Sequence, residues 1–353
     1  MSIKAEEHHS LMRDRYMTTN DIKQILLDEG FRGSIQISMN RQLVFAEAFG
    51  FSDLPNQIPN RVETKFATAS AGKVFVAISI LQLIENGKLH LQDTLGSILP
   101  MDWHAIDTDI TVEELLTHTS GIPDYFDESV MSEYEDLWKD FPNYRVRTNS
   151  DLLPLFLYKP MMYPRGSKFQ YNNTGFVVLA MMIEAVTNQP FDINLQSSLF
   201  GPCGMDSTGY YELDKLPAKC ATNYIYEPAS HNFRTNIFSV DAKGTGAGGA
   251  FTTVGDIDKL WDALLSYKLL SRETTQEMLR SHTGSDETGY YGYGIWLEPI
   301  GDNTYGPYFQ GSDPGVSFIS SYDPRSSITL TLVSNYGDNV WTLSNSIREH
   351  LTV

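Results

Sequence analysis

The sequence is poor in basic residues and in cysteine, and each shortage narrows the possible functions. Its 353 residues include 26 Lys and Arg against 44 Asp and Glu, which gives a formal net charge of −18. A chain this acidic repels a phosphate backbone and contains no basic patch, so nucleic acid is excluded as a partner. The 2 cysteines, Cys203 and Cys220, could pair, but we expect reduced packing residues.

Export and membrane segments are lacking as well. The longest apolar runs, residues 74–84 and 176–183, are too short to span a bilayer and predict buried helices instead. Residues 1–17 lack the basic start and the apolar stretch of a secretory signal. We therefore expect a cytoplasmic protein without a membrane span, or an extracytoplasmic one if a leader has been removed from the sequence given.

Patterns typical of metal and cofactor sites are also missing. Adjacent His8 and His9 lie in a polar tail, and no other His, Cys or acidic cluster has metal-ligand spacing. Gly244, Gly246 and Gly249 match a dinucleotide-binding pattern, but no parallel strand-helix-strand unit surrounds them. We interpret these glycines as a loop that passes close to a ligand site, and we predict neither a metal nor a cofactor.

Strand patterns are present at both ends of the chain. Alternating apolar residues at 35–39, a turn at Asn40 and Arg41, and an apolar return at 43–49 predict a hairpin. Further strands are expected near the C-terminus, at residues 289–297, 305–309, 316–322 and 328–334. Helices are expected at residues 20–29, 256–267 and 340–351.

The middle of the chain, from residue 75 to about 241, has helix-length apolar stretches and no convincing run of strands. The predicted fold class is therefore α/β of the α+β kind, with an antiparallel sheet from both chain ends, flanking helices and an inserted, mainly helical lobe. We expect residues 1–72 and 235–353 to form the α/β sandwich lobe and residues 73–234 the helical lobe. A ligand site is expected in the cleft between the lobes.

Ser70 and Lys73, in the stretch "ATASAGKVF", stand three positions apart at the head of a long apolar helix. That spacing places both side chains on one side of the helix. A serine needs a base to become a nucleophile, and burial lowers the pKa of a lysine so that a neutral amine is available. The helix N-terminus also directs backbone N–H groups toward a developing oxyanion. The simpler alternative is a capping serine followed by a surface lysine.

Tyr171 and Asn173, in "FQYNNTGF", precede another apolar helix. A tyrosine whose pKa is depressed by a nearby lysine can share a proton with the serine, and the asparagine can hydrogen-bond both lysine and substrate. Their structural alternatives are a packed aromatic ring and a helix cap. His118 and Ser120 in "THTSG" could suggest a second hydrolase motif, but no nucleophile elbow frames Ser120, and we favour a loop-stabilising role.

Together, "SAGK", "YNN", "ITVEELLTHTSGIPDY", "LFGPCGMDSTG" and "GAGGAFTTVGDIDKL" resemble the serine β-lactamase and penicillin-binding protein family, with its class C, DD-peptidase and esterase-like members. The resemblance implies that Ser70 is the acylated nucleophile, that Lys73 and Tyr171 transfer protons, and that Asn173 positions the substrate. It also matches the family's Lys-Thr-Gly strand to "YFQGSDPG", where Phe309, Gln310 and Gly311 fill the three positions and Ser312 supplies an oxyanion N–H.

Phe309 departs from the family pattern, because a phenyl ring provides no positive charge for a substrate carboxylate. The resemblance therefore implies a serine hydrolase that forms an acyl-enzyme on an amide, β-lactam or ester carbonyl of a small-molecule or peptide substrate. The first alternative is a carboxylesterase acting on small neutral esters, which an apolar wall at Phe309 would suit. The second is a non-catalytic penicillin-binding-like protein in which Phe309 disables turnover.

Overall fold

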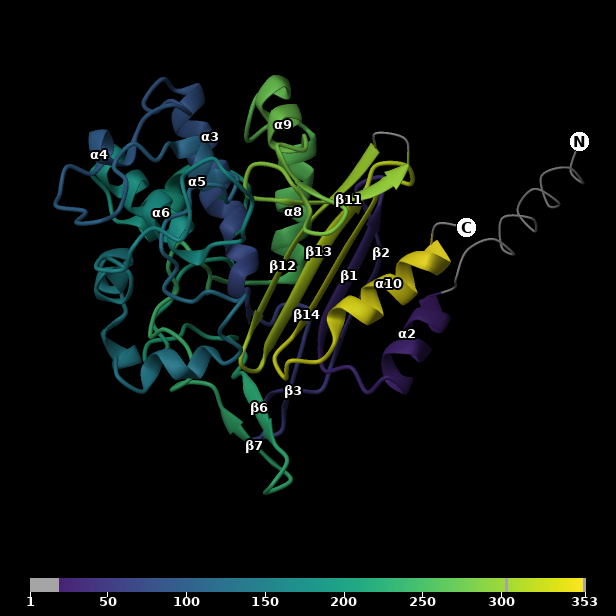
Figure 1. Cartoon of the computed structure of the whole chain (residues 1–353). Helices are drawn as coiled ribbons and strands as arrows, with labels where there is room; N and C mark the ends of the chain where they lie inside the picture. The colour runs from purple at the N-terminus through teal and green to yellow at the C-terminus, as the bar shows by residue number, and fades with distance from the viewer. Residues whose placement is uncertain (1–18, 302–303, 352–353) are drawn as a thin grey trace, which may run out of the picture.

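The structure is a computed structural model that describes residues 19–301 and 304–351. At its centre lies one eight-stranded antiparallel sheet with the strand order β2-β1-β14-β13-β12-β11-β10-β9 (Figure 1). The prediction of a sheet built from both chain ends is confirmed. The strands are β1 (Gly33–Met39), β2 (Gln42–Phe49), β9 (Thr283–Ser285), β10 (Gly289–Tyr291), β11 (Trp296–Gly301), β12 (Thr304–Asp313), β13 (Val316–Asp323) and β14 (Ile328–Ser334).

The N-terminal hairpin forms as its turn residues predict. Asn40 and Arg41 have φ angles of 50° and 64°, the left-handed conformation that a two-residue turn of type I′ requires at both central positions. Strand β1 then pairs with β2 on one side and with β14 on the other, which joins the two ends of the chain. Ile35 and Ile37 are fully buried at this junction.

Helices cover both faces of the sheet (Figure 1). On one face α2 (Thr19–Asp28) and α10 (Val340–Leu351) bury their apolar sides, with Leu26 and Ile347 both 0% exposed. On the other face α8 (Val254–Leu265) packs through Trp261, whose indole N–H donates to the Ser320 hydroxyl of β13 at 2.8 Å. A short helix, α9 (Arg272–Met278), follows α8.

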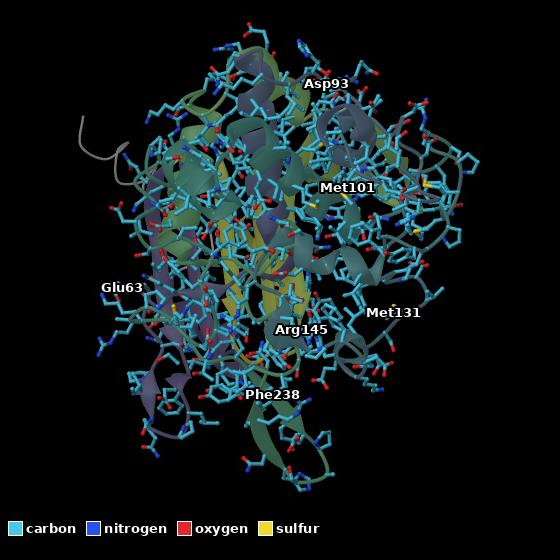
Figure 2. All side chains as sticks on the ribbon, turned by 90° about the vertical axis from the view of Figure 1, so that its left-hand side faces the viewer. Glu63, Asp93, Met101, Met131, Arg145 and Phe238 are labelled. Atoms are coloured by element: carbon cyan, nitrogen blue, oxygen red, sulfur yellow. The ribbon has the colours of Figure 1, made fainter. Side chains whose placement is uncertain are left out.

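The helical part packs beside α8 and forms one hydrophobic core with the sheet. Its two long helices, α3 (Lys73–Glu85) and α6 (Asn173–Thr187), are apolar on nearly every side, which is the pattern of a buried helix. Figure 2 turns this part toward the viewer, with Asp93 near the top and Met131 and Arg145 in the lower half. The remaining elements are α4 (Leu95–Ile98), α5 (Val112–Leu116), α7 (Phe191–Leu195), η1 (Ala69–Gly72), η2 (Tyr134–Trp138), η3 (Asn143–Arg145), η4 (Asn149–Leu155) and η5 (Gln196–Phe200).

The middle of the chain is less purely helical than the sequence analysis expects. Strands β6 (Tyr224–Glu227) and β7 (Asn232–Thr235) form a hairpin that projects from the body in Figure 1. They are only four residues long, too short for a clear alternating pattern. The division into two lobes at residues 72 and 235 stays a prediction. The other short strands are β3 (Phe51–Asp53), β4 (Ile58–Pro59), β5 (Phe66–Ala67) and β8 (Phe251–Thr252).

The strand expected at residues 289–297 is interrupted, so that β10 and β11 are separate. Gly294 lies in the interruption with φ of 69°, and a Cβ added there would lie 2.2 Å from the Cβ of Ala77 in α3. The sheet therefore touches the helical part at a position where only glycine fits.

No single helix in the described ranges is long and apolar enough to cross a membrane. Helices α6 and α7 with η5 pass that test only as a pair, bent by 77° and largely buried in the core. Residues 1–18, on which the localisation expectation and the comment on His8 and His9 rest, lie outside the described ranges. Cys203 and Cys220 are both free thiols, as expected.

Candidate active site

Ser70 lies in η1, the single 3₁₀ turn that leads directly into α3. The residue before it, Ala69, has φ of 45° and is 1% exposed, an unfavourable conformation for a residue with a Cβ. The turn is held by its neighbours, because the Ala69 carbonyl accepts from Gly249 N at 3.1 Å and Thr68 N donates to Ala250 O at 2.8 Å. Ser70 itself stays partly exposed and lines a large cavity.

Lys73 is 2% exposed, and its amine contacts only neutral oxygen atoms. The Nζ atom lies 3.0 Å from Ser70 Oγ, 2.8 Å from Asn173 Oδ1 and 2.5 Å from the Ala247 carbonyl oxygen. Burial lowers the pKa of Lys73 from 10.5 to about 8, although the negative charges of Glu128, Asp124 and Asp313 oppose that shift. The sequence prediction that Ser70 and Lys73 face each other agrees with this geometry.

The three contacts of Lys73 suit both protonation states, since an ammonium can donate to all three oxygen atoms. The Ala247 carbonyl can only accept a hydrogen bond, and the Asn173 oxygen likewise. The orientation of the Asn173 amide follows from its other end, since Nδ2 donates to the Phe126 carbonyl at 3.1 Å and to Glu128 Oε1 at 3.3 Å. A neutral amine has two N–H groups for the two obligatory acceptors and one lone pair, which can accept from the Ser70 hydroxyl.

Tyr171 joins the same group, but with a pKa shift opposite to the one expected. The Lys73 amine lies 5.0 Å from the centre of the Tyr171 ring, and the Ser70 side chain is close enough to offset part of the pKa shift of its phenol. Burial raises the pKa of Tyr171 well above 10, with Glu128 adding to the effect, and Lys73 does not offset it. The expectation of a depressed pKa is therefore wrong. Tyr171 is a hydrogen-bond donor rather than a phenolate at neutral pH.

Asp124 fixes the start of the helix that carries Asn173, and the sequence analysis did not single it out. Its carboxylate accepts from Asn173 N at 2.8 Å and from Thr174 N and Oγ1 at 3.1 Å each. Burial raises the pKa of Asp124 to about 6 despite these hydrogen bonds. The signal was available in the quoted segment "SGIPDY", where an acidic residue directly follows a turn.

Strand β12 passes directly over the N-terminus of η1, the turn that carries Ser70. A Cβ added to Gly311 would lie 2.4 Å from Thr68 O and 2.6 Å from Ser70 N, so only glycine allows this approach. Beyond Tyr308 the strand has no partner on its β11 side within the described residues, which leaves that edge open. Ser312, the expected second oxyanion donor, lies on this open segment and lines the cavity.

Phe309 does not occupy the place expected for it. Its ring is 3% exposed and packs against Trp261 and Phe318, at centroid distances of 5.3 and 6.0 Å. It is absent from the residues that line the cavity. The expectation that Phe309 forms an apolar substrate wall is therefore corrected, because its side chain points into the core between β12 and α8.

The cavity at Ser70 has a volume of about 770 Å³, and its lining includes acidic and aromatic side chains. Its acidic members are Glu128, Glu133, Glu135, Asp241 and Asp313. Arg234 is the only basic residue in the lining, and it pairs with Glu135 and with Glu227 at 2.5 and 3.1 Å. Negative charge in this cavity therefore exceeds positive charge.

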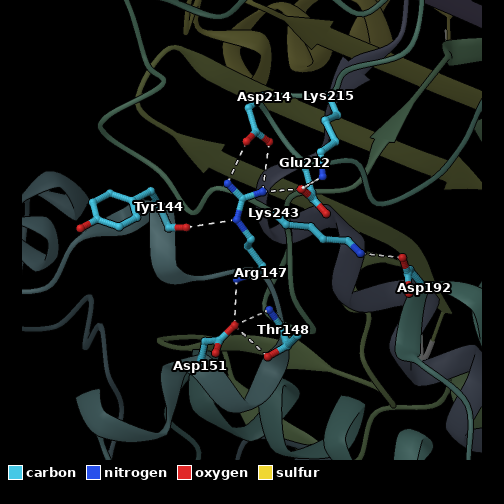
Figure 3. Close-up of polar contacts among 9 residues, drawn as sticks. All are labelled: Tyr144, Arg147, Thr148, Asp151, Asp192, Glu212, Asp214, Lys215 and Lys243. Carbon is cyan, nitrogen blue, oxygen red and sulfur yellow. Dashed lines mark hydrogen bonds and ion pairs between the residues drawn. The ribbon is translucent and has the colours of Figure 1, made fainter.

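The wall that supplies the Ala247 carbonyl is a glycine-rich loop braced by ion pairs (Figure 3). A Cβ on Gly248 would lie 2.3 Å from Ala69 O, in agreement with a loop that passes close to the ligand site. Lys243, at the start of the loop, pairs with Asp192 at 2.6 Å. Behind it Arg147 binds both oxygens of Asp214, at 3.1 and 2.9 Å, and also contacts Glu212.

His118 lies next to this site, and among the described residues it forms no hydrogen bond with Ser120. Its Nδ1 accepts from Asn172 N at 3.1 Å, and its carbonyl accepts from Gln170 N at 3.0 Å. Burial lowers the pKa of His118 well below 6.5, and the charge of Lys73 adds to this. His118 is therefore neutral and holds the segment that carries Tyr171.

Replacing Gly311 should separate β12 from the turn that carries Ser70. We expect Gly311→Ala to lower kcat by about a hundredfold, the effect of losing one oxyanion donor, and to destabilise the fold by about 1–3 kcal/mol. Gly301→Ala is the control, because a Cβ there meets no atom within 4 Å. Steady-state kinetics and thermal unfolding of both variants test this, and equal behaviour of the two would contradict the close approach.

Comparison with known proteins identifies the family. The sequence profile described as Beta-lactamase matches residues 28–344. A penicillin-binding protein from Bacillus halodurans is 36% identical, with a TM-score of 0.89 and coverage of 93% of this chain and 99% of that one. A putative penicillin-binding protein of Bacillus subtilis is 27% identical over 336 residues, covering 95% of this chain and 78% of the relative. The teichoic acid D-alanine hydrolase of Staphylococcus aureus is 26% identical over 313 residues, covering 88% and 72% respectively. The chain therefore belongs to the Beta-lactamase family.

Proposed function

We propose that this protein is a serine hydrolase that forms an acyl-enzyme on Ser70 with ester or amide substrates. One observation carries the proposal: a partly exposed serine hydroxyl lies 3.0 Å from a buried lysine amine whose pKa is lowered to about 8. The fraction of neutral Lys73 rises as the pH rises through that pKa, so a base is available near neutral pH. Relatives named hydrolases support hydrolysis over mere binding.

In the proposed acylation step, Ser70 Oγ attacks the carbonyl carbon while its proton passes to Lys73 Nζ. The carbonyl oxygen becomes an oxyanion, which we assign to the backbone N–H groups of Ser70 and Ser312. Tyr171 is protonated and lies beside Ser70 in the cavity lining, so it is suited to hand a proton to the leaving group. Asn173 holds Lys73 at 2.8 Å and positions the substrate amide or ester.

In the second step, water attacks the acyl-enzyme carbonyl, and the acyl C–O bond to Ser70 breaks. The proton that Lys73 took from Ser70 first passes to Tyr171 and replaces the one given to the leaving group, so Lys73 is neutral again. Lys73 then accepts a proton from the attacking water and returns it to the Ser70 oxygen as that oxygen leaves. No cofactor enters either step. The product is a free acid, and the enzyme returns to its starting state.

The acyl donor is better described as an ester or amide without a required carboxylate than as a β-lactam or a D-alanyl peptide. Recognition of a carboxylate needs a cation, and Arg234, the cavity's basic residue, is paired with two glutamates. The carboxylesterase alternative is favoured by this charge balance and not by Phe309, which lies in the core. The non-catalytic alternative loses the argument that it drew from Phe309 for the same reason.

Covalent labelling tests the nucleophile. We expect a fluorophosphonate to add one label per chain to the wild-type protein, as seen by intact mass, and to add none to Ser70→Ala. Ser120→Ala is the matched control and should be labelled like the wild type, because Ser120 is 1% exposed and outside the cavity. An unlabelled wild type would support the non-catalytic alternative, and a label that survives in Ser70→Ala would remove Ser70 as the nucleophile.

Substrate selectivity tests the acyl donor. Because acidic side chains repel the carboxylate of a cephalosporin, we expect kcat/KM for a short-chain nitrophenyl ester to exceed that for a chromogenic cephalosporin by about tenfold or more. The two rates are measured on the same protein at the same pH. A higher kcat/KM for the cephalosporin would contradict the ester preference and favour a β-lactamase or penicillin-binding activity.

A further inference from the structure

The acidic side of the active-site cavity contains carboxyl groups that have no cationic partner. Of the five acidic residues in the lining, only Glu135 forms an ion pair. Asp313 has no side-chain hydrogen bond or ion pair within the described part of the chain. Asp241 accepts one hydrogen bond, from the Tyr134 hydroxyl at 3.2 Å. Both side chains are half-buried in the cavity wall, where a carboxyl group with few partners is unfavourable, so these two residues need an explanation.

Asp313 is placed by strand geometry next to the reacting atoms. Gly311 and Asp313 are two residues apart on β12, so their side chains leave the same face of the strand, about 7 Å apart. The Gly311 position contacts Ser70 N. Asp313 therefore follows the nucleophile along the wall of the cavity, close enough for its charge to act on Lys73.

Both carboxyl groups have raised pKa values, as expected for acids without a cationic partner. Burial, with the charges of Asp241 and Glu128 adding to it and Lys73 opposing it, raises the pKa of Asp313 to about 8. Burial raises the pKa of Asp241 to about 7. A cation bound between the two would favour their ionised forms and release protons.

A third acceptor in the same wall is also unpartnered. Asn223 lines the cavity, is 4% exposed, and its Oδ1 has no hydrogen-bond partner. It is connected to the Asp313 segment through Asn236, whose backbone N donates to Asn223 O at 3.1 Å and whose Nδ2 donates to Pro314 O at 3.0 Å. An unsatisfied buried acceptor beside two carboxyl groups fits a ligand with several N–H donors.

We propose that Asp313 and Asp241 form an ammonium subsite that binds a protonated amine of the substrate while Ser70 attacks its ester or amide carbonyl. The inference rests on the proposed function and names its substrate class: amino-acyl esters or amides, or esters of amino alcohols. In the family pattern a cationic residue of the protein binds a carboxylate of the substrate. Here the charges are reversed, because acidic residues of the protein bind an ammonium group of the substrate. In the competing explanation the two carboxyl groups are protonated packing groups without a ligand.

Pairs of esters that differ in one group test the subsite. Alanine methyl ester and methyl 2-methylpropanoate differ by an ammonium in place of a methyl group on the acyl side. Aminoethyl acetate and propyl acetate differ in the same way on the alcohol side. At about pH 7 we expect the wild type to prefer the ammonium member of one pair by about tenfold or more in kcat/KM, the worth of a charge-assisted hydrogen bond. The pair that shows the preference tells whether the subsite binds an amine on the acyl side or on the alcohol side of the ester.

The variant Asp313→Asn keeps the shape of the side chain and removes its charge. We expect it to bring the ratio of kcat/KM for the ammonium ester over its neutral partner close to one, and Asp241→Asn to reduce the ratio as well. Glu133→Gln is the matched control, because it removes an exposed carboxylate from the same cavity and should leave the ratio unchanged. A wild-type ratio of one in both pairs, or a ratio equal in Asp313→Asn and wild type, would overturn the subsite.

Failure of the subsite and failure of the proposed function give different results. If the fluorophosphonate labels Ser70 but neither ester pair shows a preference, the hydrolase stands and the subsite is wrong. If Ser70 is not labelled, the proposed function is wrong, and the subsite is judged by calorimetric binding of alaninamide against 2-methylpropanamide. Equal binding of the two amides would then reject it, and tighter binding of alaninamide that is lost in Asp313→Asn would retain it.

Discussion

The proposed chemistry depends on a lysine amine that, among the described residues, is buried against three neutral oxygen atoms and bonds to no carboxylate. Lys73 is 2% exposed, and its contacts are a serine hydroxyl, an amide oxygen and a backbone carbonyl. A carboxylate in any of these places would hold the lysine charged and leave Ser70 without a base. The three acceptors come from three distant segments, so the fold as a whole sets the proton balance at the nucleophile.

Several features of the fold serve that arrangement. Asp124 binds the start of α6 and thereby places Asn173, and the glycine-rich loop brings the Ala247 carbonyl to the amine. Gly311 lets β12 pass over the turn that carries Ser70. Nearby negative charges raise the pKa of Lys73 and burial lowers it. The pKa is lowered overall because the effect of burial is the larger of the two. The same negative charges give the cavity its proposed preference for a cation.

The sequence predicted the parts of the site that depend on local spacing. Ser70 and Lys73 are one turn apart, and the two left-handed turn residues Asn40 and Arg41 set the hairpin, so neither needs information from elsewhere in the chain. Residues two positions apart on a strand share a face, so Gly311 and Asp313 could have been grouped from the sequence. The sequence analysis named Gly311 as a substrate contact but not Asp313. Phe309 shares that face, but only the position of α8 shows that its ring enters the core.

Other features could not be predicted because they depend on long-range contacts. The contact of the Ala247 carbonyl cannot be predicted from the sequence, because every residue has a backbone carbonyl. The pKa of Tyr171 was expected to fall beside a lysine, but its burial decides the shift, and burial is a property of the folded chain. The β6–β7 hairpin was missed because strands of four residues give too little periodicity.

A direct titration of Lys73 in the folded protein is the measurement closest to the central claim. With ¹³C-labelled lysine, the signal that disappears in Lys73→Arg identifies the residue, and its chemical shift is followed by NMR from about pH 6 to 11. We expect an apparent pKa near 8, because burial outweighs the charges of Glu128, Asp124 and Asp313. Titration at the ordinary lysine value of 10.5 would leave fewer than about one amine in a thousand neutral at pH 7, against about one in ten for a pKa near 8, and would contradict its role as the base.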